Sequence, residues 1–171
     1  RSTQRACPEM LIEMLMPDFQ GETELVQQII NARPAVLAHN LETVRRLTEK
    51  VRDSRAGYDQ SLDVLRYLKQ NCPDGYTKSS LMLGVGESRT ETLQAMKDLR
   101  NVGVDFLTIG QYLQPSKKHL KVEKFVPPEE FDELALHGDK MGFEYVASGP
   151  LVRSSYKAAE FYIERKIRGN A

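Results

Sequence analysis

"TKSSLMLGVGESRTETLQAMKDLRNVG", residues 77–103, contains the pattern that decides the fold. It opens with a short apolar run that ends at a pair of glycines. Ser88 then stands three residues before Glu91, which is the capping box of a helix N-terminus, and Gly103 is typical of a helix end. A second apolar run follows at residues 104–115. A strand, a capped helix and another strand in this order predict a parallel βαβ unit.

The same alternation continues on both sides of this unit. Apolar runs of strand length and segments with helical spacing of Leu, Val and Ile follow one another along the chain. We expect strands at residues 10–18, 35–40 and 143–148, and helices at residues 22–32, 41–51, 58–70, 127–142 and 156–167. Four or five βα units do not close an eight-stranded barrel. The pattern therefore predicts an α/β fold that is an open sheet or part of a larger barrel.

Composition excludes several classes of protein. The 171 residues are 40% hydrophobic and 28% charged, and Lys plus Arg equals Asp plus Glu. This balance favours a soluble intracellular protein that binds neither nucleic acid nor membrane. Cys7 and Cys72 have no second Cys or His at ligand spacing, so we expect no thiolate metal site within the chain. Because the chain starts at Arg1, we expect a fragment or a processed chain.

Polar residues follow the predicted strands, and parallel strands bring their carboxyl ends to one rim. Asp18, His39 and Ser79 could form a hydrolase triad, although no nucleophile-elbow sequence supports it. His39 could alternatively bind a metal or be a hydrogen-bonded structural residue. The glycine turn at residues 84–86 could cradle a phosphate, but it lacks the Lys-Ser/Thr of a P-loop. The residues alone indicate an α/β domain with a polar rim.

Six strings on that rim are more specific than any single motif. They are "MPDFQG" (16–21), "AHNLETV" (38–44), "TKSSLMLGVGE" (77–87), "LTIGQYLQPS" (107–116), "KHLKVEKFVPPEEF" (118–131) and "ASGPLVRSSYKA" (147–158). In this order they closely resemble the lipoyl synthase family. The resemblance implies a partial (βα)6 TIM-type barrel. Residues 10–116 would form about its last four βα units, and residues 117–171 a C-terminal extension carrying the Arg-Ser-Ser-Tyr motif.

The resemblance also implies an activity. The family inserts two sulfur atoms at carbons 6 and 8 of a protein-bound octanoyl group, which makes the lipoyl cofactor. It is a radical S-adenosylmethionine family with two [4Fe–4S] clusters, one of which binds S-adenosylmethionine while the auxiliary one donates sulfur. The implied partners are octanoylated carrier domains of 2-oxoacid dehydrogenases, the H protein of glycine cleavage and an iron–sulfur carrier. The implied location is a mitochondrion or plastid in a eukaryote, and the cytoplasm in a bacterium.

The family's site residues can be matched to positions of this chain. Its auxiliary cluster is held by three cysteines and the second serine of Arg-Ser-Ser-Tyr, which matches Ser155. Arg153 would hold or protonate that ligand, and Ser154 would cap the following helix. The remaining matches assign cofactor contacts to Asn40, Gly84, Gly86 and Glu87, and the substrate side to Gln111 and Gln114. Each of these could instead serve turn geometry or hydrogen bonding at the rim.

The chain departs from the family in one respect. Neither the CxxxCxxC motif of the radical cluster nor a second cysteine triplet occurs in it. We therefore expect the chain alone not to insert sulfur, and its sheet edge and apolar interior to be exposed. Two alternatives stay open. One is a catalytically inactive remnant that binds the carrier protein, and the other is an unrelated barrel enzyme that binds a phosphorylated metabolite.

Overall fold

A computed structural model of the protein describes residues 2–154, 164–165 and 167–169. Its centre is a five-stranded sheet in which every neighbouring pair is parallel. The strands are β1 (Glu13–Leu15), β2 (Val36–Ala38), β3 (Tyr76–Leu83), β4 (Phe106–Gln111) and β5 (Tyr145–Gly149). They lie in chain order across the sheet. The prediction of an α/β fold with parallel βα units is therefore confirmed.

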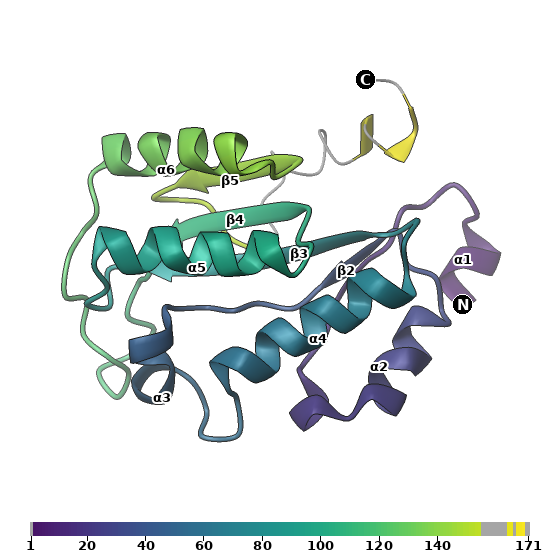
Figure 1. Ribbon diagram of the computed structural model, residues 1–171, viewed down its shortest axis with the longest axis horizontal. Helices are drawn as coiled ribbons and strands as arrows, with labels where there is room; N and C mark the ends of the chain where they lie inside the picture. Colours follow the sequence, from purple (N-terminus) through teal and green to yellow (C-terminus); the bar gives the residue numbers. More distant parts are fainter. Residues whose placement is uncertain (1, 155–163, 166, 170–171) are drawn as a thin grey trace.

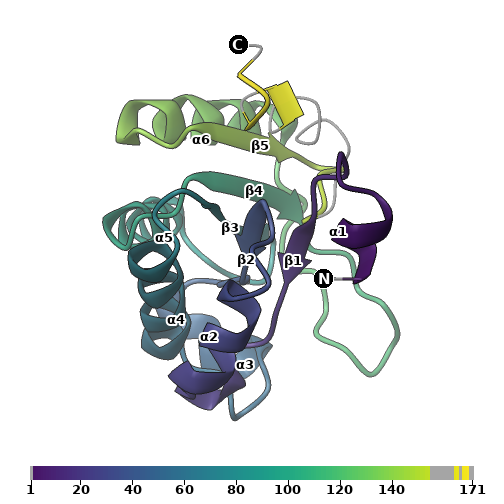
Figure 2. The same ribbon diagram turned by 90° about the vertical axis from the view of Figure 1, so that its right-hand side faces the viewer.

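The helices are α1 (Ser2–Ala6), α2 (Thr23–Ile30), α3 (Thr48–Val51), α4 (Tyr58–Asn71), α5 (Arg89–Asn101) and α6 (Pro128–Met141), with 3₁₀ turns η1 (Phe19–Gly21) and η2 (Arg45–Leu47). Helix α1 precedes the first strand, and the other helices connect strands. Figures 1 and 2 show α2, α4 and α5 together on one side of the sheet, and α1 on the other side of β1. Sequential parallel strands with external helices are consistent with part of a TIM-type fold. Among the described residues β1 pairs only with β2, and β5 only with β4, so no closed barrel is formed there.

The βαβ unit predicted from residues 77–115 is present. Ser88 Oγ accepts the N–H of Glu91, and the Glu91 carboxylate accepts the N–H of Ser88, so the capping box is confirmed. Gly103 follows the end of α5 with a φ of 91°, a left-handed conformation that glycine adopts without strain. Met96 and Leu99 of α5 are fully buried against the sheet. The capping box and the burial of one face of α5 therefore both stabilise this βαβ unit.

Two predicted elements differ from the structure. Only Thr48–Val51 of the helix predicted at residues 41–51 is α-helical, and η2 precedes it. The reason is that Glu42 extends the sheet: its N–H donates to Ser80 O at 2.9 Å, and its carbonyl accepts the N–H of Met82 at 2.7 Å. Of the strand predicted at residues 10–18, only Glu13–Leu15 forms a strand, which is β1. The helix predicted at residues 156–167 lies mostly outside the described residues.

A buried ionic contact joins the amino-terminal ends of β3 and β4. Asp105 is 6% exposed, and its carboxylate accepts the N–H of Thr77 at 2.8 Å and the ammonium of Lys69 at 2.9 Å. A carboxylate can remain buried only when such partners replace its water. This contact anchors α4 and both strands at the end of the sheet opposite to the polar rim.

Candidate functional site

A cavity of about 310 Å³ opens at the carboxyl ends of β2, β3 and β4. Three residues predicted from the sequence line it together, namely Asn40, Gln111 and Arg153. They come from three different segments, which the parallel sheet brings to the same rim. The cavity also contains Glu42 and Ser154, the residue directly before Ser155. The fold thus brings these polar groups to one cavity.

Glu42 is the functional candidate that the motif analysis did not assign. Its φ of 69° is left-handed, which is uncommon for a residue with a side chain. The Asn40 side-chain amide donates to the Glu42 carboxylate at 3.0 Å. Burial raises the pKa of Glu42 above its ordinary value of 4.5, and the hydrogen bond from Asn40 opposes this shift. A strained, half-buried carboxyl group in a cleft is a common property of functional sites.

Gln111 is buried and uses its amide group on neighbouring backbone. Its Oε1 accepts the N–H of Val126 at 2.9 Å, and its Nε2 donates to the carbonyls of Tyr112 at 3.0 Å and Lys124 at 3.1 Å. These bonds tie the end of β4 to the segment before α6. In the described structure Gln111 therefore shapes the cavity wall.

Arg153 reaches the cavity because the turn after β5 passes very close to β4. A Cβ placed on Gly110 would lie 2.2 Å from the carbonyl oxygen of Val152, so only glycine permits this approach. The guanidinium of Arg153 donates to Val152 O at 2.8 Å and to Gln111 O at 3.4 Å. Within the described ranges no carboxylate pairs with it, so its remaining N–H donors can meet an anionic ligand.

The glycine-rich turn at residues 84–87 has a different arrangement. The Glu87 carboxylate accepts the N–H groups of Gly84 at 2.6 Å and Val85 at 3.0 Å, while Gly84 and Gly86 both have positive φ. Glu87 lines a separate cavity, between the turn and helices α5 and α6. Because Glu87 already occupies these two N–H groups, they do not offer a phosphate cradle. In the structure Glu87 fixes the shape of the turn.

Gln114 and Ser155 are the remaining predicted site residues. Gln114 is exposed, and its side-chain amide donates to His119 O at 2.8 Å within the loop after β4. Ser155 lies outside the described residues, as does the helix that Ser154 was predicted to cap. The described residues include no group of three or more His, Cys, Asp or Glu side chains that could hold a metal ion. Cys7 and Cys72 are both free.

The hydrolase triad does not form. His39 is 3% exposed, with Nδ1 at 3.0 Å from Met16 O and Nε2 at 3.0 Å from Ser61 Oγ. Ser79 Oγ instead accepts the N–H of Leu41. Burial lowers the pKa of His39 below its ordinary value of 6.5, and the hydrogen bond to Met16 opposes that shift. His39 is thus a hydrogen-bonded structural residue, the alternative that sequence reasoning had left open.

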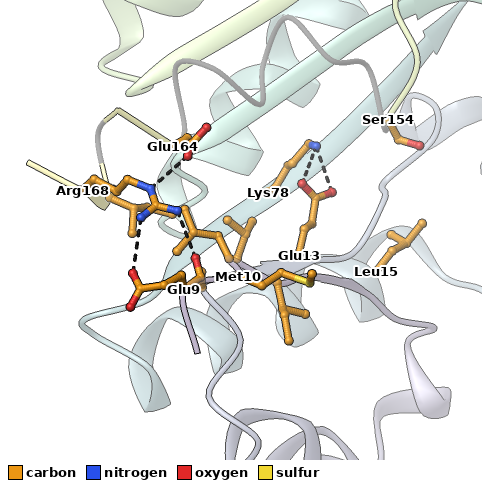
Figure 3. Close-up of a pocket in the computed structure, with 13 residues that line it drawn as sticks. Glu9, Met10, Glu13, Leu15, Lys78, Ser154, Glu164 and Arg168 are labelled. Atoms are coloured by element: carbon orange, nitrogen blue, oxygen red, sulfur yellow. Dashed lines mark hydrogen bonds and ion pairs between the residues drawn. The ribbon is translucent and has the colours of Figure 1, made fainter. Parts of the chain in front are cut away.

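A larger hollow of about 650 Å³ lies beside β1 and includes Ser154 on its wall. Figure 3 shows Lys78 and Glu13 pointing toward one another in it, with the Lys78 ammonium 2.8 Å from the Glu13 carboxylate. The Lys78 side chain is only 4% exposed, so this pairing satisfies a nearly buried charge. Met10 and Leu15 supply exposed apolar surface at the same place. Ser154 lines both this hollow and the rim cavity.

Comparison with curated proteins identifies the family. A protein of Branchiostoma floridae named lipoyl synthase, mitochondrial, is 54% identical over 98% of this chain. The lipoyl synthase of Thermus thermophilus is also 54% identical over 98% of the chain, and lipoyl synthase 2, chloroplastic, of Zea mays is 53% identical over 95%. The chain belongs to the lipoyl synthase family. The resemblance inferred from the six rim strings is therefore confirmed.

The match covers only part of each relative. The chain spans about half the length of the curated relatives it matches, with 44% of the Branchiostoma protein, 52% of the Thermus protein and 44% of the maize protein covered. No protein-family model matches the chain. The names of these lipoyl synthases include mitochondrial and chloroplastic forms as well as a bacterial one. None of the described helices has the length and apolar character needed to cross a bilayer.

Proposed function

We propose that this chain forms part of an enzyme that inserts two sulfur atoms at carbons 6 and 8 of a protein-bound octanoyl group. The observation that carries the proposal is identity of 52–55% with lipoyl synthases over at least 94% of the chain. Identity at this level along nearly the whole chain supports the same chemistry in the whole protein. The proposed substrates are octanoylated carrier domains of 2-oxoacid dehydrogenases and the glycine cleavage H protein.

The rim cavity supports a role for this chain in holding S-adenosylmethionine. It presents an amide, a carboxylate and a guanidinium, from Asn40, Glu42 and Arg153. These match the hydroxyl, ammonium and carboxylate groups of that cofactor in kind. When bound, S-adenosylmethionine supplies the radical chemistry of the family. We propose that Asn40 contacts its amino acid end, and that Gly84, Gly86 and Glu87 support its adenosyl portion through the shape of their turn.

The two [4Fe–4S] clusters do not fit the described residues, which include no suitable grouping of ligands. On the family match, Ser155 is the proposed serine ligand of the auxiliary cluster. Arg153 stands two residues before it and faces the cavity, which supports a role in holding an anionic group there. An iron–sulfur carrier that renews this cluster is the corresponding proposed partner.

The substrate side of the site is proposed to include the end of β4 and the loop after it. The buried side-chain amide of Gln111 accepts the N–H of Val126 at the end of the loop, and the exposed side-chain amide of Gln114 donates to His119 O within it. In this proposal both residues shape the entrance through which the acylated lysine arrives. Gln111→Leu would then weaken binding of the acylated carrier by releasing the loop.

The test compares the two adjacent serines in a full-length protein that carries this sequence. Ser155→Ala should retain S-adenosylmethionine cleavage but lower the rate of lipoyl formation by at least about tenfold. A rate loss of this size corresponds to the loss of one interaction that stabilises the transition state. Ser154→Ala is the matched control and should retain both activities. Absorption and Mössbauer spectra of the reconstituted protein report the clusters independently of turnover. Unchanged lipoyl formation in Ser155→Ala would show that Ser155 serves only as a helix cap.

A second candidate is a chain that binds the acylated carrier without catalysing sulfur insertion. It is favoured by the absence of a metal-binding group among the described residues. Anaerobic reconstitution of a full-length protein that carries this sequence, with iron and sulfide, separates the two. Stable, stoichiometric clusters would exclude the non-catalytic candidate, whereas carrier binding without a cluster in the full-length protein would support it.

A further inference from the structure

The loop between β4 and α6, residues 112–126, concentrates positive charge. It carries Lys117, Lys118, Lys121 and Lys124 against one acidic residue, Glu123, although the whole chain has a net charge of zero. Figure 2 shows the loop as a green excursion that projects beyond the sheet on the side of β1. A local excess of one sign on a neutral protein attracts partners of the opposite sign to that place.

The loop has no helix or strand, yet its own side chains hold its shape. The Tyr112 hydroxyl donates to Leu120 O at 2.8 Å, and Ser116 Oγ lies 2.9 Å from His119 Nδ1. Gln114 bonds to the backbone of His119, and Gln111 binds both Lys124 and Val126 at the loop's far end. A surface braced in this way loses little conformational entropy when it binds a partner.

Three lysines of the loop have no acidic partner within the described part of the chain. Lys124 pairs with Glu130 at 2.6 Å, and Glu123 pairs with Lys50 at 3.8 Å. Lys117, Lys118 and Lys121 are all exposed, and no described carboxylate lies within ion-pair distance of them. Their charge is therefore available to a partner.

The same loop forms part of the rim cavity. Leu113 and Pro115, which precede the lysines, both line it, and Leu113 is 48% exposed. A protein that held an acylated lysine in this cavity would bring its own surface against the lysine-bearing part of the loop. Electrostatic complementarity of this kind speeds association and fixes orientation.

We propose that Lys117, Lys118 and Lys121 form a docking surface for an acidic protein that presents its acylated lysine to the rim cavity. This inference rests on the proposed function, because it assigns the carrier protein's docking site. The partner is recognised by an excess of Asp and Glu around the modified lysine, and the internally braced loop provides a fixed array of ammonium groups for them.

The test measures binding of the 171-residue chain to an octanoylated carrier domain with a net negative surface around the modified lysine. Lys117→Glu with Lys118→Glu should raise the Kd roughly tenfold, mainly by slowing association, and should weaken its dependence on salt. Lys97→Glu with Lys140→Glu is the control. It makes the same change of charge at exposed positions of α5 and α6 and should alter the Kd less than twofold. Circular dichroism checks that both variants are folded.

Four results would overturn the assignment. Equal loss of binding in both double variants would indicate net charge alone, and unchanged binding in the loop variant would leave the proposed enzyme function intact but remove the docking site. Tight binding of duplex DNA that the loop variant abolishes would assign the lysines to nucleic acid instead. If the unmodified chain bound no carrier domain, the carrier partner and this docking surface would both be wrong, while S-adenosylmethionine binding would remain a separate measurement.

Discussion

Glu42 illustrates how a single residue combines strain, burial and charge. Its backbone is left-handed because its N–H and carbonyl both bond to β3, beyond the end of β2. This geometry directs the carboxyl group to the rim cavity beside Asn40. Left-handed backbone at a residue with a side chain costs roughly 1 kcal/mol or more. The folded protein thus holds Glu42 in a position that its own conformational preference opposes.

Replacing Glu42 with Gln should stabilise the chain at neutral pH. The raised pKa means that folding favours the protonated carboxyl group. This contribution is fully present below the unfolded pKa near 4.5 and is lost as the pH rises through the folded pKa. The neutral amide removes that loss, so we expect Tm at pH 7 to rise by about 2–4 °C, as for roughly 1 kcal/mol in a chain of this size. Thermal unfolding at pH 7 and pH 4.5 measures the effect.

The gain from Glu42→Gln should shrink at pH 4.5, because protonation of Glu42 removes the charge that burial disfavours. Glu49→Gln, at an exposed carboxylate of α3, is the control and should leave Tm unchanged. If Glu42→Gln had the same effect at both pH values, ionisation of Glu42 would not limit stability. The same variant should bind S-adenosylmethionine more weakly if the proposed role of the cavity is correct.

Among the elements, the parallel βαβ units follow directly from local patterns. Capping at Ser88, the left-handed glycine after α5 and the left-handed Gly142 at the end of α6 are all recognisable in the sequence. Residues 41–51 show the limit of such patterns. Leu41, Val44 and Leu47 are buried, as their helical spacing suggested, but residues 41–44 are not helical, and the backbone of Glu42 bonds to β3. The spacing of apolar residues in this segment correctly predicted which side chains are buried. The backbone conformation was decided instead by the contact of Glu42 with β3.

Gly138 sets the distance between α6 and β5, which carries the turn leading to Arg153. A Cβ on Gly138 would lie 2.5 Å from Val146 Cγ2. Gly138→Ala improves helix propensity by about 1 kcal/mol, but the overlap with a stiff β-branched side chain costs about 1–3 kcal/mol. We expect a net loss of about 1 kcal/mol in the free energy of unfolding, measured by denaturant titration.

A double-mutant cycle identifies the cause of that loss. Val146→Ala removes the atom that Gly138→Ala would meet, so the double variant should be more stable than the sum of the two single changes predicts, by about 1 kcal/mol. Strictly additive losses would mean that the close approach of α6 to β5 is not the reason for glycine at residue 138.

At the scale of the whole molecule, β1 is the exposed end of the described sheet. Leu15 is 53% exposed and Met10 51%, and both lie at the hollow beside β1. An open parallel edge with apolar side chains invites pairing with another chain. Leu15→Lys should therefore reduce concentration-dependent self-association of the 171-residue chain, measured by sedimentation velocity.

The control for this prediction is Leu25→Lys on α2, where a leucine of similar exposure lies away from the sheet edge. It should leave self-association unchanged. Equal effects of the two substitutions would show that added charge, and not the edge of β1, controls solubility. A monodisperse unmodified chain at all concentrations would contradict the prediction directly.

The sequence by itself determined the class of fold, the order of the units, the helix caps and the family. These properties depend on short-range spacing and on contiguous rim motifs, which a linear chain displays directly. Only the tertiary structure decided which polar groups meet. Asn40, Glu42, Gln111 and Arg153 share a cavity because parallel strands end on one rim and because Gly110 lets the turn after β5 approach β4. The side chains of Gln111 and Glu87 form hydrogen bonds with backbone groups, Gln111 with both N–H and carbonyl groups and Glu87 with N–H groups. The sequence does not show such pairings, because it does not display which backbone groups a side chain meets in the folded protein.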